Sequence, residues 1–263
     1  MNYETITYEL SEGIATVTFN RPAQLNAMNR RMMEEIIHAV QRFDMDPEVR
    51  VAILTGSGKA FMAGADIKEY AQQTDAEFES FQTLGRGLYT ALEANTKPVV
   101  AAINGYAFGG GLEIALACDM IVAAEAAKMG LPEILLNLIP GGGGTQRLPR
   151  KLGINRANEL LMSGRTVTAE EMQDWGCINH IYPRDNFATD ARNFAAEFAD
   201  KSPEALRILK QLSQIAAGAF NPAAQAIENE ALSRFYRSDG GQAQIQSFYQ
   251  KSLQRERERK EKS

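Results

Sequence analysis

The first 45 residues change from an alternating to a helical spacing of apolar side chains. Residues 3–19 alternate apolar and polar side chains around a Ser-Glu-Gly turn at 11–13, which predicts a β-hairpin. Residues 29–44 then place apolar side chains on one stripe behind an asparagine, a residue type that caps helices well. The segment therefore predicts a hairpin followed by an amphipathic helix that ends at Asp46-Pro47.

Short apolar runs and helical patterns alternate through the middle of the chain. Strands are expected at 50–55, 98–104, 119–124 and 177–182, and helices at 75–94 and 109–117. After residue 184 the pattern is helical throughout, in segments 185–201, 203–217, 222–237 and 242–263. Strands first and helices last predict an α/β protein with a β/α core over residues 1–184 and a helical region over residues 185–263.

The composition is that of a folded globular protein. Hydrophobic residues make up 44% of the 263 positions and charged residues 23%, close to the usual values. No apolar run reaches the roughly 18 residues of a membrane span. The first ten residues match neither a signal peptide nor a transit peptide. We therefore expect a soluble, cytoplasmic protein without a membrane partner.

Charge and cysteine content exclude further classes. The chain has 28 basic and 33 acidic residues, a net charge of −5, whereas proteins that coat nucleic acid usually carry positive charge. Cys118 and Cys177 are too few for a disulfide framework, and with His38 and His180 they show no metal-ligand spacing. We expect reduced thiols, no metal site and no nucleic-acid partner.

Several familiar catalytic motifs are absent. The sequence has no phosphate-binding loop, no dinucleotide fingerprint and no nucleophile elbow. His38 lies off the apolar stripe of its predicted helix, which favours a surface position. His180 lies in a strand pattern without an evident partner. Acid–base chemistry would therefore come from carboxylate, tyrosine or lysine side chains.

Two turns of small residues could supply free backbone amides. Residues 63–66 follow an apolar run, and Gly109–Gly111 lie between a predicted strand and a helix N-terminus, where free N–H groups favour negative charge. The two turns could form an oxyanion hole if the fold brings them together. Taken alone, each is better explained as a tight turn.

Two glutamates stand out from the other acidic residues. Glu113 falls in the first turn of the glycine-led helix, and Glu133 follows Pro132 in an almost wholly apolar segment. Each has an ordinary explanation as a residue of a first helical turn. An apolar environment raises the pKa of a carboxyl group, which suits a general acid near neutral pH. The glycines at 141–144 add a flexible turn that we expect close to Glu133.

Four segments taken together resemble the crotonase superfamily, and most closely its enoyl-CoA hydratase branch. They are residues 20–27, 59–68, 97–113 and 131–148, and their order and spacing agree with the family over roughly residues 3–250. The fold implied by the resemblance is a spiral of ββα units. Its C-terminal helices, here residues 185–263, form the contacts of a homotrimer or homohexamer.

The resemblance also implies a role for individual residues. The substrate is an acyl-CoA thioester, so that CoA is part of the substrate and no separate cofactor is expected. The amides of Ala65 and Gly110 bind the thioester oxygen. Glu133 protonates the α-carbon, Glu113 deprotonates the water that adds at the β-carbon, and the amide of Gly141 helps to position that water. Residues expected to bind the substrate or its CoA part are Gln24, Leu25, Ala63, Asp66, Ile67 and Lys68.

Retention of both glutamates favours an enoyl-CoA hydratase, a hydro-lyase of fatty-acid or related acyl-CoA degradation. Relatives that only shift a double bond commonly alter one or both acids. One alternative is an enoyl-CoA isomerase, which needs a single carboxylate. The other is a non-catalytic RNA-binding or scaffold protein that uses the mixed-charge tail at 251–263, although the net charge argues against it.

The sequence departs from the family pattern in places. Asn137 stands where relatives often have glycine, which could re-aim the acyl end of the site. Ala23 and Gln24 stand where relatives often carry a lysine near the nucleotide, and the C-terminus lacks the usual ending. Five residues could shape the acyl pocket, although core packing explains them equally well: Tyr70, Phe78, Phe81, Leu84 and Leu88.

Overall fold

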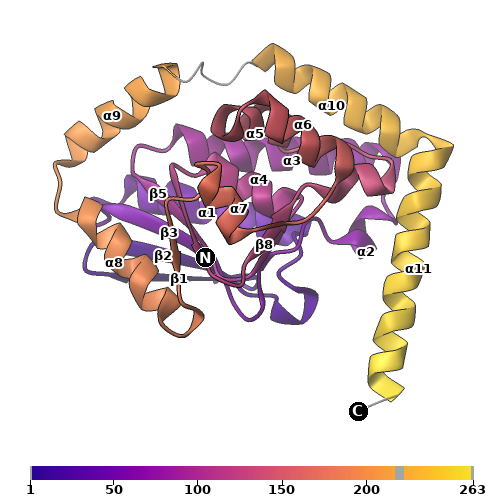
Figure 1. Ribbon diagram of the computed structural model, residues 1–263, viewed down its shortest axis with the longest axis horizontal. Coiled ribbons are helices and arrows are strands. Elements are labelled where there is room, and N and C mark those ends of the chain that lie inside the picture. Colours follow the sequence, from indigo (N-terminus) through magenta and orange to yellow (C-terminus); the bar gives the residue numbers. More distant parts are fainter. Residues whose placement is uncertain (1, 217–221, 262–263) are drawn as a thin grey trace.

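A larger and a smaller β-sheet organise the fold (Figure 1). The computed structural model describes residues 2–216 and 222–261. In the larger sheet the strands follow the order β1-β2-β3-β5-β7-β10. Their bounds are β1 (Ile6–Ser11), β2 (Ile14–Phe19), β3 (Val51–Gly56), β5 (Val99–Ile103), β7 (Met120–Ala124) and β10 (His180–Tyr182).

The predicted hairpin forms one edge of the larger sheet. β1 and β2 are antiparallel, with Ile6 opposite Phe19 and Ser11 opposite Ile14. From β2 onward, neighbouring strands are parallel. Parallel strands usually bury both faces, which explains the nearly continuous apolar runs of β3, β5 and β7.

The smaller sheet follows the order β4-β6-β8-β9. Its strands are β4 (Ala60–Met62), β6 (Tyr106–Phe108), β8 (Lys128–Gly130) and β9 (Val167–Thr168). β4, β6 and β8 follow β3, β5 and β7 in the chain, so the backbone repeatedly passes from the larger sheet to the smaller sheet and then into a helix. This repetition confirms the predicted α/β spiral of ββα units.

The helices of the core cover the sheets (Figure 1). α1 (Arg30–Met45) and α3 (Asp75–Ala94) pack against each other and have nearly the predicted bounds. Asn29 caps α1, because its side-chain oxygen accepts the N–H of Met32 at 2.9 Å. The other helices before residue 175 are α2 (Ile67–Tyr70), α4 (Gly110–Ala117), α5 (Gly144–Leu152), α6 (Ile154–Ser163) and α7 (Ala169–Asp174).

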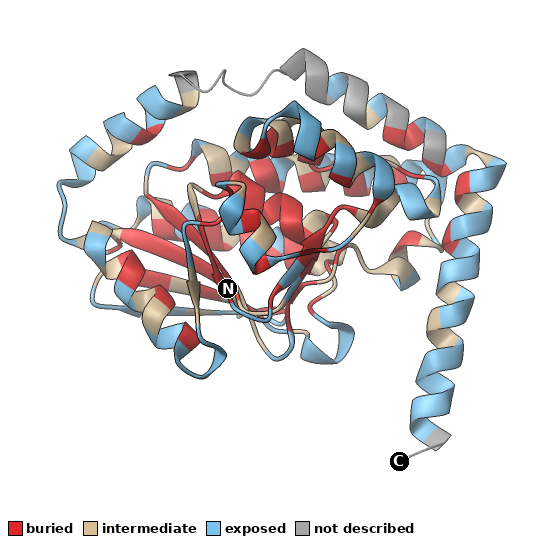
Figure 2. Ribbon diagram, viewed as in Figure 1, coloured by how far each residue is buried: buried red, intermediate tan, exposed pale blue. Residues whose placement is uncertain are grey.

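α4 begins in direct contact with the smaller sheet. A Cβ on Gly111 would lie 2.1 Å from the carbonyl oxygen of Met62 in β4, so only glycine allows this approach. The rest of α4 is buried, and Figure 2 shows buried residues concentrated here and in the sheets. The first turn of α4 is therefore fixed relative to both sheets.

The C-terminal helices run along the outside of the core (Figure 1). α8 (Phe187–Ala199) packs its apolar side chains on one face of the larger sheet. α9 (Pro203–Ala216), α10 (Pro222–Arg237) and α11 (Asp239–Glu261) follow, and α11 extends past α2 and beyond the core. The predicted ends at residues 217 and 263 lie outside the described residues.

The histidines and cysteines occupy structural positions. His38 is half-buried, and its Nδ1 forms a hydrogen bond of 2.8 Å with the Tyr3 hydroxyl, so it is less exposed than predicted. His180 is exposed and contacts the rings of Tyr182 and Phe194. The free thiols of the two cysteines, Cys118 and Cys177, are buried.

A buried carboxylate joins the start of the hairpin to α1. Glu35 is fully buried, and its oxygens accept the N–H groups of Glu4 and Thr5 at 2.9 and 2.8 Å and the Thr5 hydroxyl at 2.6 Å. Arg31 pairs with it at 2.9 Å. Burial alone would raise the pKa of the Glu35 carboxyl, but these hydrogen bonds and the Arg31 charge outweigh it and hold the pKa below its ordinary value of 4.5.

The low pKa of Glu35 predicts a pH-dependent stabilisation. Because the carboxyl is more acidic in the folded state, its contribution is complete above pH 4.5 and is lost as the pH falls through the folded-state pKa. We expect Glu35→Gln to lower the free energy of unfolding by about 2 kcal/mol at pH 7 and by less at pH 3.5. Urea unfolding at both pH values measures the difference, and an equal loss at both would contradict this assignment.

Candidate active site

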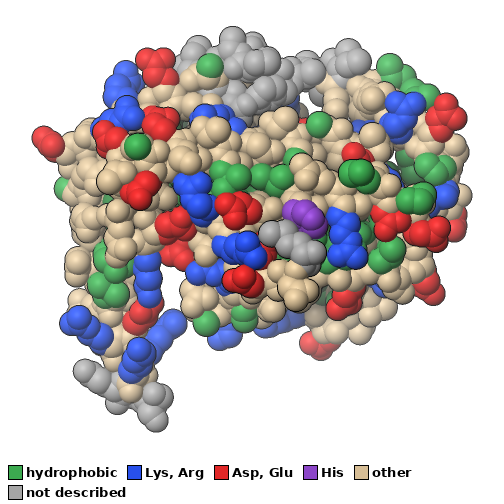
Figure 3. Space-filling model, turned by 180° about the vertical axis from the view of Figure 1, so that it is seen from behind, with side chains coloured by type: hydrophobic (Ala, Val, Ile, Leu, Met, Phe, Trp, Pro, Cys, Tyr) green, Lys and Arg blue, Asp and Glu red, His purple; other side chains and the backbone are tan. Residues whose placement is uncertain are grey.

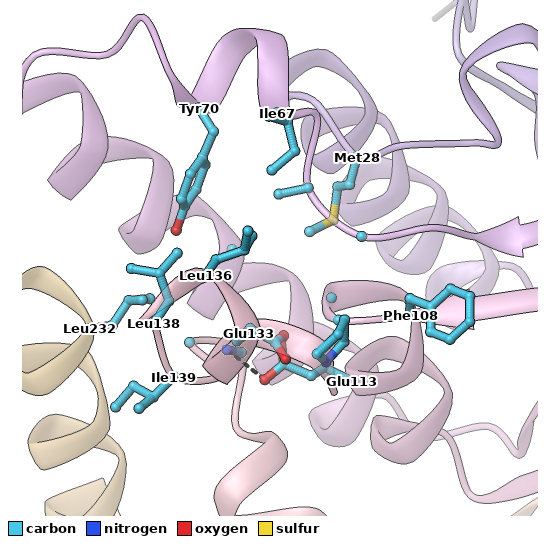
Figure 4. A pocket seen from close by; sticks show the side chains of 18 of the residues that line it. Met28, Ile67, Tyr70, Phe108, Glu113, Glu133, Leu136, Leu138, Ile139 and Leu232 are labelled. Carbon is cyan, nitrogen blue, oxygen red and sulfur yellow. Dashed lines mark hydrogen bonds between the residues drawn. The ribbon is translucent and has the colours of Figure 1, made fainter. Parts of the chain in front are cut away.

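An apolar cavity of about 400 Å³ lies where the two glycine turns and the two singled-out glutamates meet (Figure 4). Its walls come from segment 63–67, the turn between β6 and α4, the short helix η2 (Pro132–Leu136) and the loop at 138–142. Met28 and residues of α1, α2, α3, α10 and α11 complete the walls. The elements that form it are distant in sequence, and the ββα spiral brings them together.

Both amides predicted to form an oxyanion hole line this cavity. Met28 donates its N–H to the Gly64 carbonyl and accepts the N–H of Asp66, each at 2.8 Å. In such a parallel bridge the amide of the residue between them, Ala65, faces away from Met28. Gly110 is the first residue of α4, where an amide has no acceptor within its own helix. Two N–H groups are thereby available to a ligand oxygen.

The two turns are in close contact. A Cβ on Gly109 would lie 3.7 Å from the Cα of Gly64 and 3.0 Å from Oε1 of Glu133. Gly109 also has a φ of +52°, a conformation that residues with a Cβ rarely adopt. The backbone conformation therefore favours glycine here, and the Glu133 carboxyl group lies close to this turn.

Glu113 is fixed by the glycine loop. Its side chain is almost completely buried in the first turn of α4. Its Oε1 accepts the N–H groups of Gly142 and Gly144, each at 2.8 Å. The 141–144 turn was expected to be flexible and close to Glu133, but the structure ties it to Glu113. Helix α4, the loop at Gly142 and the first residue of α5, Gly144, therefore hold this carboxyl group in one position.

Glu133 reaches the same cavity from η2. It is the second residue of η2 and is half-buried, with Pro132, Leu136 and Leu138 beside it along the cavity. Figure 4 shows the carboxyl groups of Glu113 and Glu133 next to each other, with apolar side chains around them. The arrangement can place an acid and a base side by side against one face of a small reactant, close to two backbone N–H donors. Within the described ranges, no group of His, Cys, Asp or Glu side chains could hold a metal ion.

Comparison with known proteins decides the family. A family model described as enoyl-CoA hydratase/isomerase matches residues 9–257. The chain belongs to this family. The predicted resemblance to the enoyl-CoA hydratase branch of the crotonase superfamily is confirmed.

Three relatives show the extent of the similarity. The chain is 42% identical to a probable enoyl-CoA hydratase of Mycobacterium bovis over 80% of this chain and 81% of that protein. It is 36% identical to a crotonyl-CoA hydratase of Syntrophomonas wolfei over 95% and 97% of the two chains. A crystal structure of an enoyl-CoA hydratase from Mycobacterium avium subsp. paratuberculosis superposes with a TM-score of 0.87 at 27% identity, covering 94% and 99% of the chains.

The structure separates the six predicted substrate-binding residues of this enoyl-CoA hydratase/isomerase family member into three pairs. Ala63 and Ile67 line the cavity. Gln24 and Leu25 are exposed in a short helical turn outside it, and the Leu25 carbonyl accepts the N–H of Ala63 at 3.1 Å. This places the 24–25 turn at the margin of the cavity.

Asp66 and Lys68, the other two, have partners outside the cavity. Asp66 pairs with Arg21 at 2.8 Å and caps α2 by accepting the N–H of Lys68. The Lys68 ammonium pairs with Glu256 of α11 at 2.9 Å. Asp66 therefore supports the start of α2, and Lys68 links α2 to α11 beside the cavity.

Gly141 and Asn137 lie on either side of the loop at 138–140. Gly141 lines the cavity beside Gly142, whose amide with that of Gly144 contacts Glu113, and its role in positioning the water stays a prediction. Asn137 ends η2 with a φ of +56°, which explains why glycine is common there and why asparagine is tolerated. Its side-chain nitrogen lies beside Gly240 of α11, and Asn137 is not among the residues that line the cavity.

Sequence reasoning missed several lining residues. Tyr70 and Phe81 line the cavity and Phe78 packs behind them, whereas Leu84 and Leu88 belong to the core. Residues not anticipated from the sequence include Met28 and Met33, Gln82, Gly85 and Tyr89 of α3, Leu138 and Ile139, Leu232 of α10, and Gln244, Ser247, Phe248 and Lys251 of α11. Gly85 and Tyr89 follow Phe81 at intervals of four residues, the spacing of one helix face, and this signal could have identified them.

A buried arginine holds the glycine loop. Arg147 makes two hydrogen bonds of 2.7 Å to the Glu93 carboxylate and a third to the carbonyl oxygen of Gly142. Its planar guanidinium can serve both partners at once, whereas a lysine ammonium cannot reproduce the bidentate pair. Arg147 is therefore a positioning residue that acts on Glu113 through the loop.

We expect Arg147→Lys to lower kcat about tenfold with a smaller change in KM, because the Glu113 carboxyl group would lose its fixed position. Steady-state kinetics with an enoyl-CoA measure the two constants separately. Arg150→Lys, at an exposed position of the same helix, is the matched control. If Arg147→Lys lowers the folding stability but leaves kcat unchanged, Arg147 has only a structural effect.

Proposed function

We propose that this protein catalyses the reversible syn addition of water to a trans-2-enoyl-CoA, giving a 3-hydroxyacyl-CoA. The observation that carries the proposal is the convergence of two carboxyl groups and two backbone N–H donors on one apolar cavity. The names of the relatives, a probable enoyl-CoA hydratase and a crotonyl-CoA hydratase, support the same reaction.

The backbone amides stabilise the charge that develops during the reaction. When water adds at the β-carbon, the electrons of the double bond move toward the thioester and form an enolate oxygen. The N–H groups of Ala65 and Gly110 donate to that oxygen. Each donor of this kind contributes about 3–4 kcal/mol to stabilising the transition state.

The two glutamates exchange protons with the reacting atoms. Glu113 accepts a proton from the water as its oxygen bonds to the β-carbon, and Glu133 donates a proton to the α-carbon. Glu113 ends protonated and Glu133 ionised, and proton exchange with solvent restores both. Because the two carboxyl groups lie next to each other (Figure 4), both approach the double bond from one side, and the two additions occur on the same face.

The molecules that bind the protein follow from this reaction. An acyl-CoA is the substrate, and CoA enters and leaves with it rather than serving as a resident cofactor.

Exposed apolar side chains on α9, such as Leu209 and Leu212, support assembly into a homotrimer or homohexamer through the helices of residues 185–263. Light scattering should give three or six times the chain mass of 29.0 kDa, and a monomer would contradict this assembly.

We propose a cytoplasmic enzyme without a nucleic-acid or membrane partner. Among the described residues, no helix is both long and apolar enough to cross a bilayer. On the face seen in Figure 3, acidic and basic side chains are interspersed. The end of α11 carries Arg255, Arg257 and Arg259 with Glu256 and Glu258 between them, which does not make the concentrated basic surface that phosphate binding needs.

The direct test uses the wild-type protein with trans-2-enoyl-CoAs of 4 to about 16 carbons. We expect loss of the enoyl-thioester absorbance and formation of the 3-hydroxyacyl-CoA, detected by mass spectrometry. Absence of turnover at every chain length would refute the proposed hydratase. The enoyl-CoA isomerase is tested in parallel with a trans-3-enoyl-CoA, whose conversion without hydration would favour that alternative.

A further inference from the structure

The cavity has an open and a closed end, and this polarity places the parts of an acyl-CoA. Phe248 of α11 and Leu135 of η2, 44% and 62% exposed, border the open end. Tyr70, Phe81 and Gln82, all less than 10% exposed, lie at the closed end. The nucleotide of CoA is too large for this cavity and must leave through the open end. On the proposed function, the acyl chain therefore points toward the closed end.

An aromatic wall stops the acyl chain. The Tyr70 ring packs edge-on against Phe78, Phe81 and Tyr236, with ring centroids 5.5 to 5.7 Å away. Phe78 and Tyr236 stack at 3.8 Å, and the Tyr236 hydroxyl bonds to the carbonyl oxygen of Tyr70 at 3.0 Å. These contacts join α2, α3 and α10 behind the cavity. The wall favours short acyl chains.

The wall presents a polar pair to an otherwise apolar cavity. The side-chain amide of Gln82 donates to the Tyr70 hydroxyl at 2.9 Å. Figure 4 shows the Tyr70 hydroxyl directed into the cavity toward Leu138. At the other end of the pair, Gln82 Oε1 lies near Gly141 of the cavity wall, 3.0 Å from where a Cβ on that glycine would be.

This pair has hydrogen-bonding capacity left for a ligand. Within residues 2–216 and 222–261, the hydrogen bond between them is the one found for the Tyr70 hydroxyl and for the Gln82 side chain. If the amide is turned by 180°, Tyr70 donates to Gln82 instead, and an amide N–H and a phenol lone pair remain. Either way, one donor and one acceptor face the cavity, and a hydroxyl group satisfies both at once.

The local charge argues against a carboxylate at this position. Burial raises the pKa of the Tyr70 hydroxyl most, and the nearby Tyr236, Glu133 and Glu113 raise it further, so the field there opposes negative charge. Lys251, a cation of the cavity wall, lies on α11 with the residues of the open end. A neutral polar group is therefore favoured over an acid.

We infer that this enzyme is selective for short trans-2-enoyl-CoAs whose distal carbon carries a hydroxyl group, held by Tyr70 and Gln82. The hydroxyl accepts one hydrogen bond from the pair and donates another. A methyl group in its place leaves both buried polar groups without partners, which is costly. The inference assigns a substrate class to the proposed hydratase site and rests on that function.

The test compares substrates that differ only at the distal carbon. Trans-2-enoyl-CoAs of four to seven carbons with a terminal hydroxyl, methyl or carboxylate group are assayed with the wild type. For at least one length we expect a kcat/KM about tenfold higher for the hydroxyl substrate than for its methyl counterpart. Tyr70→Phe should reduce this ratio about tenfold, and the ratio is read from active enzyme only, so partial misfolding does not affect it. Tyr182→Phe, in β10 and outside the cavity wall, is the matched control.

The possible outcomes separate the two claims. A hydroxyl-to-methyl ratio near one at every length, or a ratio that Tyr70→Phe leaves unchanged, overturns the inference while hydration of crotonyl-CoA leaves the proposed function intact. A preference for the carboxylate substrate also overturns it, because the pair would then recognise an acid. Absence of turnover with every substrate, crotonyl-CoA included, refutes the proposed function instead.

Discussion

Glu133→Gln is expected to lower kcat for crotonyl-CoA hydration about 10³-fold, because glutamine cannot donate the proton that the α-carbon must receive. Glutamine has nearly the same shape as glutamate, and Glu133 is only half-buried in η2, so the loss of its charge should affect the fold little. Folding stability should therefore change little. The enoyl-thioester absorbance measures the rate, and thermal unfolding measures the stability.

The matched control for this prediction is Glu125→Gln. Glu125 is an exposed glutamate outside the cavity wall, so the same chemical change there should leave the rate near that of the wild type. A Glu133→Gln variant that keeps more than a tenth of the wild-type kcat would show that another group supplies the proton.

Glu113→Gln is expected to lower hydration by a similar factor for a different reason. The glutamine oxygen can still accept the N–H groups of Gly142 and Gly144, so the loop should stay in place. The variant lacks only a base for the water. A general base typically raises the rate about 10²- to 10⁴-fold. Rates with crotonyl-CoA test this expectation, with Glu125→Gln again as the control.

The Glu113 variant also separates hydratase from isomerase. An isomerase moves a proton between two carbons and can do so with one carboxyl group. If Glu113→Gln converts a trans-3-enoyl-CoA at the wild-type rate, and the wild type hydrates no enoyl-CoA, the isomerase alternative is favoured. Combining both substitutions should cost little more than either alone, because the two carboxyl groups act in one step.

Long periodic elements could be predicted well from the sequence. α1 and α3 have enough turns for the apolar stripe and the caps to agree, and both were found at nearly the expected bounds. The strands of the smaller sheet have two or three residues, too few to show any period. Their positions are set by pairing across the spiral, which depends on residues distant in sequence.

The candidate site shows the same division. Glu113 and Glu133 could be singled out because glycine and apolar neighbours surround them in the sequence. Gln82 could not, because its importance comes from the Tyr70 hydroxyl that α2 places beside it. Burial is also an incomplete guide to function, since Glu35 is fully buried and its carboxylate serves to join the hairpin to α1.

Isotope incorporation tests the central claim, that the two carboxyl groups add water across the double bond of an enoyl-CoA. Crotonyl-CoA is incubated with the enzyme in deuterated water enriched in ¹⁸O, and the product is examined by mass spectrometry and NMR. The account predicts 3-hydroxybutyryl-CoA with ¹⁸O on the β-carbon and one deuterium on the α-carbon, added to the same face, and almost no product from Glu133→Gln. Unchanged crotonyl-CoA, or free CoA with ¹⁸O in a released carboxylate, would contradict it.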